Sequence, residues 1–452
     1  MRPLAAAVAA LFVCLLVVSG VLWAAGTFDD DSVDESASAP ASTNEVQGDA
    51  AETPSSTVAP SVSQSEPNED ANTDAGVPLP ETSTTTSTTT TTTTEAPRIR
   101  GSNLFVSPTG TDEPDGGWTF DDPLRSPNFA VEVSRPGDTI HLLPGDYEPL
   151  EISGRDDLTV SAPQGGVTLS SGSYEQRAGV LVEDSTNIVI DGLRTERSLW
   201  GIRVFASHGV VVRNNEVFDT GQEAIHVLAR STDVTIENNL VDTTGQRVGS
   251  SDGLEFRDRG EGIYLGTGGQ FEGGVDDVSN VRILGNIVRN VTAEAVEIKA
   301  SVFDVVVRGN LIHDVDVHSG AAVSIGRGTR TYDANVIVEN NAIWNVTARD
   351  GRPDGIGVRV SSPATVQNNA IWNTQHHGIK IDTELRAVDG AVSVVDNVIA
   401  TAGVSSVDDD SADTGVSVTI VGTREGSIVT DIVGDLDSPD VDGLVDRLQD
   451  LS

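Results

Sequence analysis

Residues 336–347 read VIVENNAIWNVT, and residues 364–374 repeat the phrase as ATVQNNAIWNT. Each phrase has alternating apolar residues, then two turn-forming Asn residues, and then a second apolar run. In this phrase and its looser copies, the second Asn recurs at steps of 24, 47, 24, 31, 28 and 28 residues. The seven positions are Asn215, Asn239, Asn286, Asn310, Asn341, Asn369 and Asn397. A short period with alternating apolar residues predicts a solenoid in which every repeat adds one turn of β-strands, called a rung below.

Each repeat also contains a second strand pattern, small–Ile/Val–x–Ile/Val, as in residues 224–227 (AIHV) and 295–298 (AVEI). Turns of ~22–28 residues with two or three short strands predict an all-β, single-stranded right-handed parallel β-helix with Val and Ile inside. We expect the recurring Asn residues to stack as a hydrogen-bonded ladder. The coil ends need caps, because open strand edges pair with other chains. Short helical caps are predicted near residues 120–135 and 438–451.

The chain is predicted to have three parts: a leader at 1–26, an acidic Thr/Ser-rich disordered stalk at 27–97, and the β-helix domain at 98–452. Within the domain, the N-terminal cap covers about 98–138, the rungs about 139–430 and the C-terminal cap about 431–452. The leader contains a 22-residue apolar stretch, 4–25, which is close to the ~20 residues that span a bilayer. A retained signal anchor with its N-terminus inside and a cleaved signal peptide both fit. Either one predicts export, to the outer face of the membrane or as a secreted protein.

Composition narrows the choice of partners. The formal net charge of −41 argues against nucleic acid or anionic lipid, so membrane contact is expected only through the leader. The single cysteine, Cys14, lies in the leader, so the folded part has neither a disulfide nor a cysteine metal site. We expect a monomer that acts on an extracellular polysaccharide.

Aligning the second strands on their small residue places equivalent positions one rung, ~4.8 Å, apart. The predicted outward column is Arg203, His226, Tyr264, Glu297, Ser324, Gly357 and Lys380. The column at the preceding corner is Trp200, Glu223, Glu261, Glu294, Ala321, Asp354 and His377. The column after the strand is Phe205, Leu228, Gly266, Lys299, Gly326, Arg359 and Asp382. The 47-residue step adds residues on both sides of 262–266, and such loops usually form the walls of a groove.

Stacked carboxylates repel one another, so they need a cation, a proton or a basic neighbour. A calcium site is one interpretation, with Glu223, Glu261, Glu294 and Glu297 as candidate ligands. Two of these carboxyl groups could instead serve as acid and base in sugar hydrolysis. The third interpretation is a solvated, salt-bridged face with Arg282, Arg289 and Arg308 nearby.

The chain has only two lysines, and both fall on these columns. Lys299, which the alignment places between Gly266 and Gly326, is the first candidate for a base in β-elimination, with His226 and Tyr264 as the alternative base and acid. The candidates for binding substrate carboxylates are Arg203, Arg359 and Lys380. Trp344 and Trp372 occupy equivalent places in successive rungs, where they could bind sugar rings or simply form an aromatic ladder.

The stretches LFVSPTGTDEPDGGWTFDDPLRS from Leu104 and PGDTIHLLPGDYEPLEISG from Pro136 resemble the N-terminal cap of the pectate-lyase-like right-handed β-helix superfamily. The phrases GIRV (201–204), GQEAIHV (221–227), GEGIYLG (260–266) and TAEAVEIKA (292–300) are similar to uncharacterised secreted bacterial β-helix repeat proteins. The resemblance implies the fold for about residues 102–400. For activity it implies less, because the superfamily includes lyases, hydrolases, epimerases and non-catalytic surface proteins. The vWiDH motif of pectate lyases and the NTD, DD and GHG set of polygalacturonases are absent from the sequence.

In several lyases of this fold a Lys or Arg is the catalytic base, which agrees with Lys299 as the first candidate. We therefore predict a polysaccharide lyase that acts by β-elimination on a uronate-containing glycan. A non-catalytic, glycan-binding or adhesive surface protein and a glycoside hydrolase with stacked carboxylates are the two alternatives.

Overall fold

The computed structural model describes residues 102–175, 177–247, 259–267, 276–318, 320–327, 335–349, 352–382, 390–411 and 417–425. The predicted leader (1–26), stalk (27–97) and C-terminal cap (431–452) lie outside the described residues. Within the described ranges, no helix is long and apolar enough to cross a membrane.

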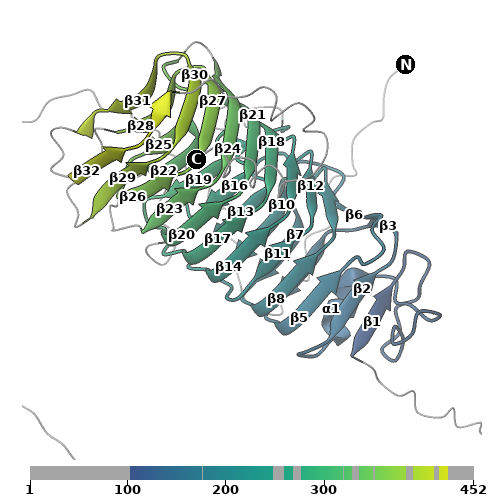
Figure 1. Cartoon of the computed structure of the whole chain (residues 1–452). Coiled ribbons are helices and arrows are strands. Elements are labelled where there is room, and N and C mark those ends of the chain that lie inside the picture. Colours follow the sequence, from purple (N-terminus) through teal and green to yellow (C-terminus); the bar gives the residue numbers. More distant parts are fainter. Residues whose placement is uncertain are drawn as a thin grey trace, which may run out of the picture. The chain divides into compact units, whose positions relative to one another are not determined.

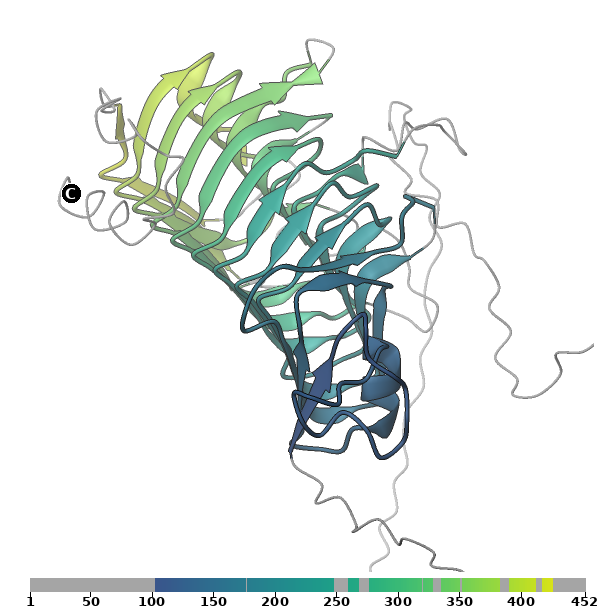
Figure 2. The same ribbon diagram turned by 90° about the vertical axis from the view of Figure 1, so that its right-hand side faces the viewer.

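The described strands form three parallel sheets, and each strand pairs with its equivalents one rung before and one rung after (Figures 1 and 2). The first sheet has twelve strands: β1 (Asn103–Val106), β2 (Thr139–Leu142), β5 (Asp156–Ser161), β8 (Thr186–Asp191), β11 (Val211–Arg213), β14 (Thr232–Glu237), β17 (Ser279–Leu284), β20 (Phe303–Arg308), β23 (Val336–Glu339), β26 (Ala364–Gln367), β29 (Ala391–Val395) and β32 (Ser417–Val421).

The second sheet has eleven strands: β3 (Gly145–Tyr147), β6 (Val167–Ser170), β9 (Arg194–Glu196), β12 (Glu216–Phe218), β15 (Leu240–Asp242), β18 (Ile287–Val291), β21 (Leu311–Val317), β24 (Ala342–Ala348), β27 (Ala370–Thr374), β30 (Val398–Ala402) and β33 (Arg424–Glu425). The third sheet has ten: β4 (Leu150–Ser153), β7 (Ala178–Glu183), β10 (Trp200–Phe205), β13 (Ile225–Leu228), β16 (Ile263–Leu265), β19 (Val296–Lys299), β22 (Ala321–Arg327), β25 (Ile356–Val360), β28 (His377–Ile381) and β31 (Ser405–Asp409). The all-β architecture with a parallel coil is as the sequence predicts.

The inside of the coil is lined by the alternating apolar residues of all three sheets. Val305 and Val307 are typical, because both are completely buried, while Val306 between them is only partly buried. Burying one such aliphatic side chain stabilises the fold by ~1.5–3 kcal/mol. The open N-terminal end is closed by the one described helix, α1 (Pro127–Val133), which packs against β1, β2 and β4. This helix confirms the cap predicted within residues 120–135.

Helix α1 begins where its sequence indicates. Ser126 is the N-cap, and its hydroxyl accepts a hydrogen bond from the N–H of Phe129 at 3.3 Å. Pro127 follows at the first helical position, where the missing N–H costs no hydrogen bond. The helix buries Pro127, Ala130 and Val131 against the coil.

The predicted Asn ladder is confirmed at the turn between the first and second sheets. From Asn215 to Asn397, each side-chain amide donates to the carbonyl oxygen of the next Asn in the ladder at 2.9–3.0 Å. The same oxygen also accepts the backbone N–H of the preceding Asn at 2.8–3.0 Å. Every ladder Asn is at most 1% exposed. An Asn side chain suits this position because its amide group donates to one neighbour while its carbonyl oxygen accepts from another.

The residue before each ladder Asn explains the rest of the phrase. Asn214, Asn340 and Asp396 have φ of 55°, 55° and 51°, and Gly285 has φ of 61°. This left-handed region is readily adopted only by Gly, Asn and Asp. The alternation of NN, GN and DN in the sequence therefore reports a single backbone conformation.

Replacing Asn310 with Ala should destabilise the coil by ~2–4 kcal/mol. The side-chain amide of Asn310 donates to Asn341 at 3.0 Å and to the carbonyl of Ile283 at 3.0 Å, and its oxygen accepts from Asn286. Removal leaves several buried groups without partners, at ~1–3 kcal/mol each. Urea unfolding measures the change. The matched control is Asn103→Ala, an exposed residue of β1, where a loss below ~1 kcal/mol is expected. Equal losses would contradict a special role for the ladder.

Candidate functional site

The predicted outward column lies on the third sheet and is correct over five rungs. Arg203, His226, Tyr264, Glu297 and Ser324 are successive register partners on β10, β13, β16, β19 and β22. Their side chains therefore follow one another at intervals of one strand spacing, ~4.8 Å.

The predicted position of Gly357 in this column is wrong. Ser324 pairs with Arg359, and Arg359 pairs with Lys380. Gly357 instead occupies the small-residue position, because a Cβ placed on it would lie 2.5 Å from the carbonyl oxygen of Gly378. The alignment failed because Gly355 and Gly357 are two residues apart, and the pattern small–Ile/Val–x–Ile/Val can start at either one. For the same reason Ile356, and not Asp354, lies beside Ala321 at the corner.

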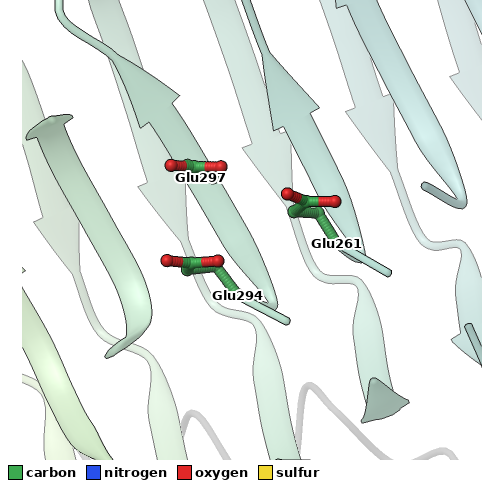
Figure 3. Close-up of side chains that lie close together, drawn as sticks. All are labelled: Glu261, Glu294 and Glu297. Carbon is green, nitrogen blue, oxygen red and sulfur yellow. The ribbon is translucent and has the colours of Figure 1, made fainter. Parts of the chain in front are cut away.

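Glu261, Glu294 and Glu297 come together on two neighbouring rungs of this sheet (Figure 3). Each offers a carboxylate oxygen, and these three oxygens lie within 4.8 Å of one another. The side chains are only 7%, 5% and 2% exposed, so the interpretation as a solvated face is wrong. The arginines expected nearby lie on other sheets, where Arg289 pairs with Asp242 and Arg308 with Glu339.

Lys299 is the cation of this cluster. Its Nζ lies 2.7 Å from Oε1 of Glu297 and 5.3 Å from the ring centroid of Tyr264. Gly266 is its neighbour as predicted, since a Cβ placed there would lie 3.3 Å from the Cβ of Lys299. Gly326 is not, because the register shifts after Ile298 and sets Lys299 opposite Arg327.

Burial controls the protonation of the acidic residues. It raises the pKa of the Glu223 carboxyl to about 7. Burial also raises the pKa of Glu261 well above its ordinary value, and the charges of Glu223, Glu297 and Glu294 add to this. Oε2 of Glu223 and Oε2 of Glu261 are buried without a hydrogen-bond partner. At neutral pH the cluster therefore holds protons, which lowers the negative charge that a substrate would meet.

His226 is buried and held in one tautomer. Its Nε2 lies 3.1 Å from the carbonyl oxygen of Gly266, which can only accept, so Nε2 carries the proton. Nδ1 then presents its lone pair, and this buried atom has no hydrogen-bond partner. Burial, with the positive charges of Arg203 and Lys299, lowers the pKa of His226 to about 3. The ring lies against Tyr264, with centroids 4.6 Å apart. His226 is thus a neutral imidazole whose buried Nδ1 lone pair has no hydrogen-bond partner.

Arg203 occupies the rung before His226. Its guanidinium lies 4.3 Å from the Trp200 ring centroid, and its Nε is buried without a hydrogen-bond partner. A guanidinium in this setting can bind a carboxylate of a ligand, because it is planar and permanently charged. The column thus offers a cation, a neutral base and a phenol in succession.

Comparisons with known proteins agree with this architecture. Residues 152–343 and 274–433 match the family described as "Right handed beta helix region", and together these matches cover more than half of the chain. The chain belongs to the right-handed β-helix family. No curated protein matches it significantly.

Solved structures share the fold of this right-handed β-helix protein at low sequence identity. The lacto-N-biosidase from Eubacterium ramulus is 12% identical with a TM-score of 0.50, over 72% of this chain and 68% of its own. The alginate lyase from Paenibacillus sp. is 18% identical with a TM-score of 0.49, over 66% of this chain and 95% of its own. Together with the family match, the lacto-N-biosidase comparison agrees with the right-handed β-helix fold that the sequence predicts.

The other basic candidates of the β-helix protein already have acidic partners. Nε of Arg359 lies 2.7 Å from Asp382. Nζ of Lys380 lies 3.5 Å from Asp408 and 3.2 Å from Asp410. Their role in binding substrate carboxylates stays a prediction, and it would require a substrate to displace these acids.

The two tryptophans lie on the second sheet and not beside the glutamates. Trp344 on β24 and Trp372 on β27 stack with their ring centroids 4.8 Å apart and 3° between planes. His313 extends the stack on the other side, with its centroid 4.3 Å from Trp344. Trp344 is 5% exposed, so its faces are covered by its neighbours. The geometry favours the aromatic-ladder interpretation, and a sugar-binding role stays a prediction.

Sequence patterns gave no indication of Asp276, which is 1% exposed near the column. Its Oδ1 accepts the N–H of Arg230 at 3.0 Å, in a turn where Ala229 and Arg230 have φ of 61° and 62°. This turn directly follows β13, so Asp276 holds the end of the strand that carries His226. Asp276 belongs to the extra residues of the 47-residue step and has no equivalent in the repeat, so no periodic signal could identify it.

Proposed function

We propose that this protein cleaves a uronate-containing polysaccharide by β-elimination on the outer face of the third sheet. The observation that carries the proposal is His226, whose unpartnered Nδ1 lies on the rung between Arg203 and Tyr264. Elimination needs a neutral base, a cation for the uronate carboxylate and an acid for the leaving oxygen. The three rungs supply these groups in order, and a regular column suits a polymer.

In this mechanism Nδ1 of His226 takes the proton from C5 of the uronate. The C–H electron pair becomes the C4=C5 double bond, and the C4–O bond to the preceding sugar breaks. The hydroxyl of Tyr264 protonates the leaving oxygen, and the proton on His226 then returns to the phenolate. The two rings are 4.6 Å apart, and Lys299 Nζ lies 5.3 Å from the Tyr264 ring, where its charge favours the phenolate.

The carboxylate of the uronate would bind Arg203, whose charge stabilises the negative charge that develops when C5 loses its proton. The protonated Glu223, one rung along the corner, can donate a hydrogen bond to the same group, since its pKa is raised to about 7. A wall of ionised glutamates would repel a polyanion. Protons held by Glu223 and Glu261 reduce that repulsion.

The role of Lys299 differs from the first expectation. An amine 2.7 Å from a carboxylate oxygen is held as an ammonium ion, and an ammonium ion cannot take a proton. We therefore assign the base to His226 and give Lys299 an electrostatic role beside Glu297 and Tyr264.

The three clustered glutamates fit a calcium ion, which we include in the proposal. Oxygens bound to one Ca²⁺ at ~2.3–2.6 Å lie at most ~5 Å apart, and the three carboxylate oxygens lie within 4.8 Å of one another. Oε2 of Glu261 is buried and has no hydrogen-bond partner, so it is available as a ligand. The ion would supply positive charge for a second substrate carboxylate. The remaining candidate ligand, Glu223, lies on the rung before Glu261.

Added Ca²⁺ should raise the unfolding temperature, and more strongly at pH 8 than at pH 6. Binding must displace the proton of Glu261, whose pKa is raised, so affinity increases with pH. A ligand at 100 times its Kd stabilises the native state by ~2.7 kcal/mol. Thermal unfolding with CaCl₂ or chelator measures this, with Glu294→Gln expected to abolish the shift. No shift at either pH would mean that protons and Lys299 alone balance the cluster.

One assay separates the candidate functions. The purified protein is incubated with a panel of uronate polymers, with Ca²⁺ or a chelator, while absorbance of the unsaturated product and new reducing ends are recorded. A rise in both supports elimination. Reducing ends without absorbance would instead indicate hydrolysis. Hydrolysis is the second candidate because Glu261, whose pKa is raised, has a carboxylate oxygen within 4.8 Å of one of Glu297, and such a pair can serve as acid and base. Binding without either signal would leave a glycan-binding surface protein.

A further inference from the structure

Ser405, His377 and Asp408 meet on β28 and β31, at the far end of the third sheet from α1. The hydroxyl of Ser405 lies 2.6 Å from Nδ1 of His377, and Nε2 of the same ring lies 3.3 Å from Oδ2 of Asp408. Ser405 and His377 are register partners, and Asp408 is the register partner of Lys380. None of the three takes part in the mechanism above.

The three side chains have the order of a nucleophile, a base and an orienting acid. A carboxylate can only accept, so the proton of His377 lies on Nε2, and Nδ1 then accepts the hydrogen of the Ser405 hydroxyl. A nucleophile and base within ~2.6–3.2 Å, with the base held by a third group, is the arrangement that activates serine. Nζ of Lys380, 3.5 Å from Asp408, favours the ionised carboxylate.

The backbone around Ser405 offers the remaining element, a donor for a developing oxyanion. The N–H of Val404 donates to His376 and that of Asp410 to Ile381, both toward β28. Alternate N–H groups of a strand point to opposite edges, so the N–H of Ser405 points away from β28. In the part of the chain that the structure describes, β31 is the last strand of its sheet on this side. Val404, directly before β31, is 60% exposed, so the start of this strand meets solvent.

We propose that Ser405, His377 and Asp408 form a second active site that hydrolyses esters. The Ser405 oxygen attacks the ester carbonyl while its proton passes to Nδ1 of His377. The tetrahedral intermediate then collapses, the C–O bond to the alcohol breaks, and His377 protonates that alcohol. A water molecule then attacks the acyl carbon while His377 takes its proton. The bond from that carbon to the Ser405 oxygen breaks, the carboxylic acid leaves, and His377 returns the proton to the Ser405 oxygen. The N–H of Ser405 donates to the oxyanion in both steps.

The substrate class follows from the place of this site. β31 lies six strands from β13, which carries His226, so the two sites are ~29 Å apart along one sheet. One polymer could contact both. If the proposed polysaccharide function holds, the ester is an O-acyl group on a glycan hydroxyl, and its removal would expose the chain for cleavage. The ester chemistry itself does not depend on that function.

A fluorophosphonate probe and p-nitrophenyl acetate test the site on the full-length protein. We expect about one probe per chain, with mass spectrometry placing it on Ser405. Ser405→Ala should abolish labelling and lower turnover of the acetate by at least ~10³-fold, and His377→Gln should act similarly. Ser406→Ala, the adjacent serine, serves as the matched control and should keep both signals.

Circular dichroism and thermal unfolding confirm that each variant is folded. The proposal would be overturned if Ser405→Ala were still labelled, or if its turnover of the acetate stayed within threefold of the wild type. The absence of both labelling and turnover in the wild type would also overturn it. The uronate assay is run in parallel on Ser405→Ala and His226→Gln. If His226→Gln loses only elimination and Ser405→Ala loses only ester hydrolysis, the two sites are independent. Failure of elimination in the wild type leaves the ester assay fully interpretable.

Discussion

Replacing His226 with Gln is expected to lower the rate of β-elimination by ~10²–10⁴-fold. General-base catalysis contributes factors of this size, and Gln cannot take a proton from carbon. The Gln amide can still donate to the carbonyl of Gly266, which His226 contacts at 3.1 Å, so the fold should be retained. The loss should fall on kcat, with KM nearly unchanged, because Arg203 and the acids still bind the substrate. Initial rates of absorbance increase measure it.

The matched control is His208→Gln, an exposed histidine at the start of a first-sheet rung whose Nδ1 bonds Thr232 at 2.9 Å. It should retain wild-type rates. The pH profile adds a second check. Because the pKa of His226 is lowered to about 3, the acid limb of the wild-type pH profile should show no fall near pH 6.5 and should decline as pH drops toward 3. On the alkaline side, activity should fall as Glu223 loses its proton near pH 7. A His226→Gln rate within fivefold of the wild type would remove His226 as the base.

The sequence predicts the scaffold well because the scaffold is periodic. The second Asn of each phrase has one structural solution, and its ladder spans Asn215 to Asn397 in the structure. The outward column is correct up to Ser324 because the full pattern small–Ile/Val–x–Ile/Val, with Leu allowed at its end, fits each of those strands in one register only. It fails at Gly355 and Gly357, where two glycines fit one alternation and only cross-strand pairing chooses between them.

The sequence predicts which residues form the site, but not their burial or their protonation. Alternation places Glu261 and Glu297 outside the coil, and an outward position suggests solvent; yet both are more than 90% buried. The tautomer of His226 depends on the Gly266 carbonyl one rung away, a contact that no spacing along the chain encodes. Ser405 follows His377 by 28 residues, the same step as in the last Asn phrases. That pairing could have been recognised had the alignment been extended one rung further.

Replacing Lys299 with Met should lower the free energy of unfolding by ~3–5 kcal/mol near neutral pH. The substitution leaves the carboxylate of Glu297, 2% exposed, without the ammonium that lies 2.7 Å away. Removing one partner of a buried ion pair costs this much because the other charge stays buried. Glu294 lies close by, and its carboxylate oxygen is within 4.8 Å of one of Glu297. Denaturant unfolding at pH 8 and pH 5 measures the loss, which should shrink at pH 5, because Glu223, whose pKa is raised to about 7, is then protonated and no longer adds negative charge.

The double variant Lys299→Met with Glu297→Gln tests whether the loss comes from the unpaired charge of Glu297. Because it removes both charges, it should recover most of the lost stability, since neutral replacements of a buried pair are often tolerated. The same proteins test the role of Lys299 in catalysis. A base at Lys299 would leave the double variant stable but inactive by ~10²-fold or more. If His226 is the base and Lys299 only stabilises the phenolate of Tyr264, the rate should stay within about tenfold of the wild type, corresponding to ~1.4 kcal/mol of transition-state stabilisation.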